Sequence, residues 1–279
     1  MYYTIGIEKP GEEGRKISFK REFTREEQDK FLEYTKYLGL HFNNKNLYKS
    51  MVKNGEELEN FLEEIKNKDS SQIGNPDYVI FESNRLLMNY LSMFRSYVDH
   101  ISCSLSKIFD SNTKEQFVKF THRVYDNRFE YRFLSRLRNF AQHFGVPINS
   151  LISNQYGNHV AIDRDNLLIY EGWSSVKEEI KKMEEIIPVQ SIAYRMNETI
   201  KILYLFVMNF YAEGIVESIK WINLLEEELG GEAILTVSDS FEEFKSGNFK
   251  LQTLNYQEYV NAVHDLNENP DINIDITQI

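Results

Sequence analysis

The sequence predicts a mainly α-helical protein: a helical bundle with small α+β additions at both termini and an inserted β-hairpin. The central part of the chain carries apolar residues three and four positions apart, the spacing of a buried helix face. Both ends instead show short strand-like runs beside turn-forming residues. We therefore expect an α+β region at 1–75, a helical bundle at 76–229 and an α+β tail at 230–279.

The first 75 residues are expected to hold a hairpin and two helices. Residues 2–8 and 16–23 are predicted to pair around the turn KPGEEG. Thr24 and Glu27 form a T-x-x-E capping box that opens an amphipathic helix. A second, polar helix is expected at about 56–66, and KNKDSSQIGNP (66–76) is the best linker candidate.

Three helices are expected next, at about 81–109, 114–125 and 128–144. The apolar stripe of the third helix comprises Phe129, Phe133, Leu137, Phe140 and Phe144. Gly145 suits the position just after its end, and Pro147 prevents continuation.

The remaining elements follow from turn and capping residues. Residues 159–170 predict a small hairpin with a DRDN turn, and Ser175 is expected to cap a charged helix that ends by Pro188. Residues 189–229 predict one long helix or two, with any break expected near Gly214. The tail contains the runs AILTV, SFEEF, FKLQTL and YQEYVNAVHDL, which together predict a short α+β segment.

Composition indicates a globular protein of the cytoplasm. The single cysteine, Cys103, excludes an internal disulfide, fits a reducing compartment and is expected to be buried. The start of the chain lacks the features of a signal peptide. The most apolar run, ILYLFVMNFY, is only half the length needed to span a bilayer, so we expect no membrane association.

Charge is distributed unevenly. The net charge of −11 argues against a protein that coats nucleic acid in general. The segment from residue 107 to residue 143, however, contains eight basic residues and four acidic ones. This segment is either a solvated helix face of mixed charge or a local patch that attracts phosphate.

No metal or cofactor motif is present in the sequence. There is no H-E-x-x-H, no paired cysteine, no Walker loop, no G-x-G-x-x-G and no G-x-S-x-G. We therefore expect neither a metal nor a cofactor.

The hexapeptide RNFAQH places Arg138, Asn139 and His143 near the end of one helix. A histidine can remove the proton of a ribose 2′-hydroxyl, and an arginine can grip and neutralise the phosphate that this hydroxyl attacks. The same spacing of arginine and histidine recurs at Arg95 and His100, and about one such pair is expected by chance. RNFAQH is therefore either a site for RNA cleavage or ordinary helix surface.

The segments NRLLMNYLSMFRSYVDH and YDNRFEYRFLSRLRNFAQHFGVPI resemble the HEPN superfamily of helical-bundle proteins over about residues 80–225. The family motif is an arginine, four to six residues and a histidine, with a polar residue, often asparagine, directly after the arginine. Arg138, Asn139 and His143 match it. Family motifs often continue with a tyrosine, whereas Phe144 and Gly145 stand here, which leaves any tyrosine role in doubt.

The resemblance implies a metal-independent endoribonuclease, acting as a toxin or in antiphage defence, that dimerises so that two Arg/His pairs face one cleft. His143 would then be the general base or acid, and Arg138 would bind the scissile phosphate. Asn139 would orient Arg138 or the phosphate. RNA would be guided by Arg128, Arg132 and Arg136. The expected partners are RNA, a second copy of the chain and an antitoxin or regulatory protein.

Two other functions stay open: a non-catalytic HEPN scaffold that binds a protein, and a module that binds a nucleotide without cleaving it. Asp99 and His100 could face the same cleft or form ion pairs within the bundle. Asn84, Arg85 and Asn89 could support the site through hydrogen bonds or be solvated.

Overall fold

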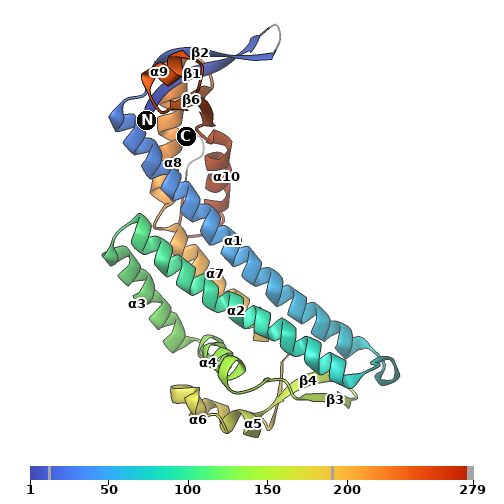
Figure 1. Cartoon of the computed structure of the whole chain (residues 1–279). Coiled ribbons are helices and arrows are strands. Elements are labelled where there is room, and N and C mark those ends of the chain that lie inside the picture. The colour runs from blue at the N-terminus through green and yellow to red at the C-terminus, as the bar shows by residue number, and fades with distance from the viewer. Residues whose placement is uncertain (12–13, 190–191, 275–279) are drawn as a thin grey trace. The chain divides into compact units, whose positions relative to one another are not determined.

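The computed structural model describes residues 1–11, 14–189 and 192–274. The protein is mainly helical, with 66% of its residues in helices, and it has two small antiparallel sheets (Figure 1). The predicted class is thus confirmed. The chain forms two compact units, Met1–Phe42 with Phe206–Ile279, and Asn43–Leu205. This division differs from the boundaries expected at 75 and 229.

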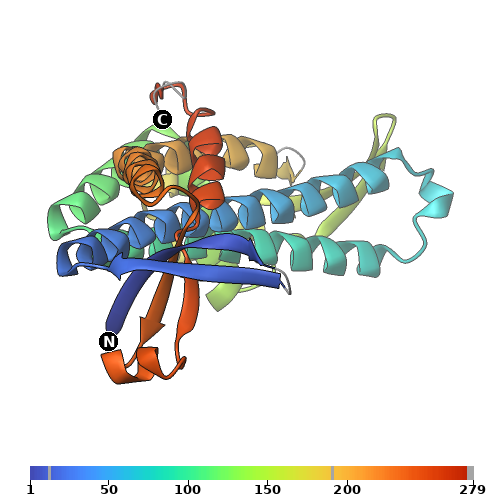
Figure 2. The same cartoon turned by 90° about the horizontal axis from the view of Figure 1, so that it is seen from above.

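The first unit contains a sheet built from both ends of the chain. Its strands are β1 (Tyr2–Gly11), β2 (Gly14–Glu22), β6 (Ala233–Ser238) and β7 (Lys250–Thr253), in the order β2-β1-β6-β7 (Figure 2). The expected pairing of β1 with β2 is confirmed, although its turn lies outside the described residues. The two terminal α+β segments, which the sequence presents as separate additions, therefore form one structure.

Helices complete the first unit. They are the beginning of α1 (Arg25–Asn67), α8 (Ala212–Leu229), the short α9 (Phe241–Lys245) and α10 (Tyr256–Leu266). The capping box is confirmed: Thr24 N–H donates to Glu27 Oε2 at 2.7 Å, and Glu27 N–H donates to Thr24 Oγ1 at 3.2 Å. The expected division into two helices is found: the break falls after α7 (Ile192–Met208), at residues 209–211, a few positions before Gly214. Gly214 lies inside α8, where an added Cβ would come within 2.4 Å of the Tyr37 ring.

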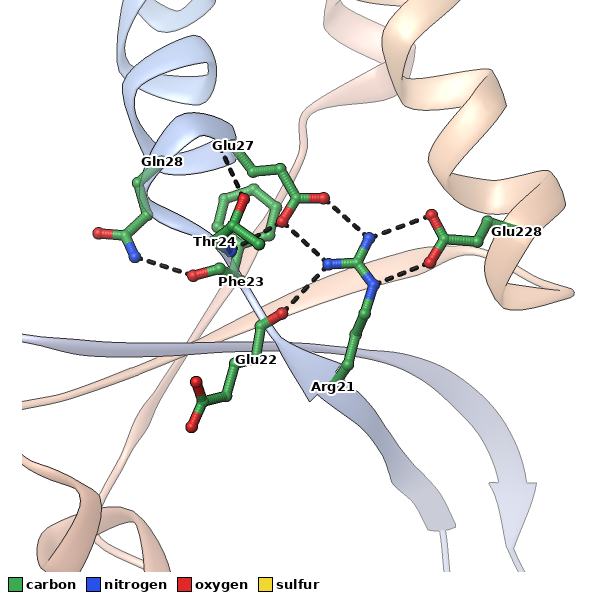
Figure 3. A network of polar contacts seen from close by, with 7 residues as sticks. All are labelled: Arg21, Glu22, Phe23, Thr24, Glu27, Gln28 and Glu228. Carbon is green, nitrogen blue, oxygen red and sulfur yellow. Dashed lines mark hydrogen bonds and ion pairs between the residues drawn. The ribbon is translucent and has the colours of Figure 1, made fainter.

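Arg21 joins β2 to α1 and α8 within this unit (Figure 3). Its Nη1 and Nη2 donate to both carboxylate oxygens of Glu27 at 2.9 and 2.8 Å, and its Nε and Nη2 donate to Glu228 at 2.8 and 3.1 Å. Nη1 also donates to the carbonyl of Glu22 at 3.1 Å. All five N–H groups of this guanidinium therefore have acceptors. The carboxylates in turn raise the pKa of Arg21.

The second unit holds most of α1 and a group of three helices, α2 (Pro76–Ile108), α3 (Ser111–Asn127) and α4 (Phe129–His143). The expected second helix at 56–66 is wrong as a separate element, because α1 runs on without a break. Asn44, in its polar middle, is buried: its Oδ1 accepts from the Tyr97 hydroxyl at 2.8 Å and its Nδ2 donates to the Tyr204 carbonyl at 3.2 Å. The polar middle of α1 thus takes part in the packing of this unit. After α1, η1 (Ser70–Gln72) leads to α2.

A three-stranded sheet follows α4, with the order β3 (Ser150–Asn154), β4 (Gly157–Asp163) and β5 (Ile186–Pro188). The predicted hairpin at 159–170 is misplaced, because Asp163 caps the short helix α5 (Arg164–Leu168) by accepting from Asn166 N–H at 2.9 Å. The predicted cap at Ser175 is also wrong. It lies within η2 (Glu171–Val176), and α6 (Lys177–Ile180) starts without a side-chain cap.

Two further expectations have structural outcomes. Cys103 is exposed, contrary to its expected burial. Among the described helices, none is by itself long and apolar enough to cross a membrane, although α7 and α8 together, as a bent pair, meet the criteria of length and composition.

We expect Asn84→Ala to lower the free energy of unfolding by about 2–4 kcal/mol. The buried Asn84 amide donates to the Ile148 carbonyl at 2.7 Å and accepts from the Ile148 N–H at 2.9 Å, so the change leaves two buried backbone groups without partners. Urea unfolding measures the effect. The exposed Asn89 on the same helix is the matched control, and Asn89→Ala should change stability by less than about 0.5 kcal/mol. Equal effects of the two changes would contradict the assignment.

We expect Glu27→Gln to reduce stability at neutral pH by about 1–3 kcal/mol and much less at low pH. Burial alone would raise the pKa of Glu27, but hydrogen bonds from Arg21 and Thr24 outweigh it and lower that pKa. The stabilisation is therefore complete above the pKa of the unfolded chain and disappears as pH falls through the lower, folded value. Unfolding at pH 7, 5 and 3.5 measures the gap, with Glu26→Gln, an exposed neighbour, as control. A gap that widens on acidification would refute this account.

Candidate functional site

A cleft of the second unit lies between α2, α3 and α4 and has a volume of about 690 Å³. The three helices contact one another pairwise, and Figure 1 shows α3 and α4 on the same side of α2. Each helix contributes the residues of one broad face, which include neighbouring pairs that recur every three or four positions. Sequence periodicity therefore explains which side chains reach the cleft once the helices are packed.

Aromatic side chains form the closed part of the cleft. Phe94 of α2, Phe117 of α3 and Tyr131 of α4 are buried, and the rings of Phe94 and Tyr131 meet edge to face with centroids 5.0 Å apart. The ring of Tyr125 also meets the ring of Tyr131 edge to face, with centroids 5.9 Å apart. Burial raises the pKa of Tyr131, so its hydroxyl stays protonated and can donate a hydrogen bond at neutral pH.

The polar lining is mostly cationic. Its charged members among the described residues are Arg95, Asp99, Arg136 and Arg138, so three arginines face one aspartate. Asp99 lines the cleft and also accepts from Arg95 Nε at 2.8 Å, so both alternatives considered for Asp99 hold. The lining also includes Ser102, Ser135, Asn139 and His122. In a protein of net charge −11, this cleft concentrates positive charge where an anion could enter.

Arg138 is half-buried, and no acidic side chain among the described residues forms an ion pair with it. Its Nε is buried and has no hydrogen-bond acceptor within the part of the chain that the structure describes. Its Nη1 donates to Asn139 Oδ1 at a long 3.3 Å. A buried N–H without an acceptor costs about 1–3 kcal/mol, and an anionic ligand that supplies an acceptor would recover this energy.

Arg132 has a structural role instead. Its guanidinium donates to Glu179 at 2.7 and 3.3 Å and to the carbonyls of Tyr125 and Asp126 at 2.9 and 2.6 Å. Those carbonyls lie in the last turn of α3, where helical partners run out, so Arg132 satisfies the end of one helix from another. The side chain is only 16% exposed and does not line the cleft. We therefore remove it from the set of RNA-guiding residues.

Of the other site residues expected from the sequence, some line the cleft and some do not. Arg136 and Asn139 line the cleft with Arg138. Arg128, half-exposed before α4, lies 3.9 Å from Glu130 and is outside the lining. His143 is exposed at the end of α4 and also lies outside the lining. Helix geometry places His143 about 40° around from Asn139 and roughly 6 Å further along the axis.

Two lining residues were not assigned a role from the sequence. His122 comes from α3 and Arg95 from α2, and both lie far from RNFAQH along the chain. The basic segment at 107–143 includes His122, so the sequence did point to the region. Asn84 supports the loop after α4 through Ile148 and does not line the cleft.

No group of three or more histidine, cysteine or acidic side chains is placed to hold a metal ion among the residues described. The polar side chains of the cleft supply guanidinium, imidazole, amide, hydroxyl and carboxylate groups. These groups can bind phosphate and transfer protons.

We expect Arg132→Met to lower the free energy of unfolding by about 1–3 kcal/mol, because it removes the Glu179 ion pair and two helix-end hydrogen bonds. Arg138→Met should leave stability unchanged or raise it slightly, since methionine keeps the apolar stem and removes a buried N–H without an acceptor. Thermal and urea unfolding of the two matched variants provide the comparison. A larger loss from Arg138→Met would mean that Arg138 is structural.

No protein-family model, no curated protein sequence and no solved structure matches this chain. The resemblance to HEPN proteins therefore rests on the residues of the sequence alone.

Proposed function

We propose that the chain is a metal-independent endoribonuclease of HEPN type, and that RNA binds in the cleft between α2, α3 and α4. The observation that carries the proposal is Arg138, a half-buried guanidinium with an unsatisfied N–H in a cationic cleft. Arginine keeps its charge at any physiological pH and holds phosphate through two N–H groups at once. A phosphate of RNA supplies the acceptors that the folded chain does not.

The proposed reaction is an attack by a ribose 2′-hydroxyl on the adjacent phosphorus. Arg138 offsets the charge that develops on the non-bridging oxygens, and Asn139 holds the guanidinium through their hydrogen bond. Arg136, which also lines the cleft, contacts a neighbouring phosphate. His143, one turn beyond Asn139, acts as acid or base on RNA that extends past the cleft.

The resemblance to HEPN proteins also suggests a cellular role and an oligomeric state, which we include in the proposal. The chain acts as a toxin or antiphage effector in the cytoplasm, forms a homodimer and is restrained by an antitoxin or regulatory protein. Overexpression that slows growth in the wild type, and does not in Arg138→Ala, is the expected cellular result.

One observation favours a second candidate, a non-catalytic module that binds RNA, a nucleotide or a protein on the same bundle. His143 does not line the cleft that holds Arg138. A cleft of about 690 Å³ lies within the size range of small-ligand sites, so phosphate can be held there without cleavage. Binding lost in Arg138→Ala, without cleavage by the wild type, would identify this module.

The test is cleavage of single-stranded RNA by the purified full chain in EDTA. We expect products with 2′,3′-cyclic phosphate ends, and a rate that falls about 10²–10³-fold in Arg138→Ala because one charged donor to the transition state is lost. RNA binding should weaken in the same variant. Arg85→Ala is the control, since Arg85 is an exposed arginine of α2 paired with Glu82 and outside the cleft. Cleavage that survives Arg138→Ala unchanged would end the proposal.

A further inference from the structure

His122 occupies a position on α3 that turns toward the cleft. Val118, four residues before it, and Tyr125, three residues after it, line the same cleft, so all three share one face of the helix. From the other helices, Arg138 and Asn139 of α4 line it as well. The fold thus places an imidazole and the proposed phosphate-binding arginine in one space, although 15 residues separate them in sequence.

The imidazole of His122 has no structural task among the residues that the structure describes. It is exposed, and no hydrogen bond or ion pair joins it to another described side chain. His41 shows the contrast, because it is buried and its Nε2 lies 3.0 Å from Asp265. A histidine that faces a cationic cleft without such a bond keeps both ring nitrogens available to a ligand.

Cleavage by 2′-hydroxyl attack needs two proton transfers, one from the 2′-oxygen and one to the 5′-oxygen. Arginines cannot supply them, because they remain protonated. Tyr131 cannot act as the base at neutral pH, since burial raises its pKa and makes it a weaker acid as well, and Asp99 is engaged by Arg95. Within the described residues, His122 is the only histidine that lines the cleft.

We propose that His122 performs one of these two proton transfers, as a second acid–base group beside His143. This inference rests on the proposed ribonuclease function. In the balanced step, a base takes the proton of the 2′-hydroxyl, the 2′-oxygen forms a bond to phosphorus, and the bond from phosphorus to the 5′-oxygen breaks. An acid gives its proton to the leaving 5′-oxygen, and no oxidant or other reactant is needed.

The surroundings of His122 define what a pH profile reports. Arg95 and Asp99 face the cleft from α2, Arg136 and Arg138 from α4, and Tyr125 from α3 itself. Arginine, tyrosine and aspartate side chains ordinarily titrate outside pH 5–8, whereas imidazole titrates within it. A limb of the rate profile in this range that depends on His122 therefore belongs to its imidazole.

The experiment compares the full-length wild type with His122→Ala and His122→Gln in EDTA, using single-stranded RNA from pH 5 to 8. We expect both variants to lose about 10²–10⁴ in cleavage rate and one limb of the profile, with RNA binding retained. His264→Ala, which changes an exposed histidine on α10, should behave as wild type. His122→Gln keeps a polar side chain of similar reach, so its loss of rate reports the missing proton transfer.

The outcomes separate this inference from the proposed function. Wild-type cleavage that persists in both His122 variants, with an unchanged profile, overturns the role of His122 and leaves the ribonuclease standing. Absence of cleavage by the wild type overturns both. Where the His122 variants are slow, RNA with sulfur in place of the bridging 5′-oxygen assigns the role, because sulfur leaves without a proton. Restored cleavage makes His122 the acid, and persistent loss makes it the base.

Discussion

The packing of α2, α3 and α4 leaves a space that the side chains of the bundle do not fill, and this space determines which polar groups can act together. Buried aromatic rings close one part of it, where Phe94 and Tyr131 meet edge to face. Arginines line the remainder, and they come from two different helices. Protein interiors are ordinarily close-packed, so an open space lined by charge indicates a site for a ligand more strongly than it indicates loose packing.

The arginines of this chain differ in how their donors are satisfied, and that difference separates structure from function. Arg21 uses all five N–H groups on Glu27, Glu228 and a carbonyl, and Arg132 is similarly committed to Glu179 and the end of α3. Arg138 makes one long bond to an amide and keeps a buried N–H unsatisfied. The first two arginines hold elements in place. The third keeps bonding capacity that none of the described residues uses.

The sequence predicted those elements that depend on residues close to one another along the chain. The helices at 76–108, 111–127 and 129–143 follow from their apolar periodicity, and the capping box at Thr24 follows from two residues three positions apart. The sheet that joins both chain ends could not be predicted in this way, because β1 and β6 pair across more than 200 residues. The continuous α1 was missed because its polar middle is buried through Asn44, whose partners lie on other helices. His122 was missed for the same reason, since only helix packing brings it to the cleft of Arg138.

The size and charge of the cleft also bear on which RNA the proposed enzyme accepts. A volume of about 690 Å³ suits one nucleotide unit and not a duplex. Unstacked bases of single-stranded loops can enter such a space, with their rings beside Tyr125 and their phosphate at Arg138. The acidic remainder of the chain would repel RNA elsewhere, since the net charge is −11. The affinity for RNA would then come from the contacts in this cleft alone. Recognition would depend on an RNA that can present an extruded nucleotide to the cleft.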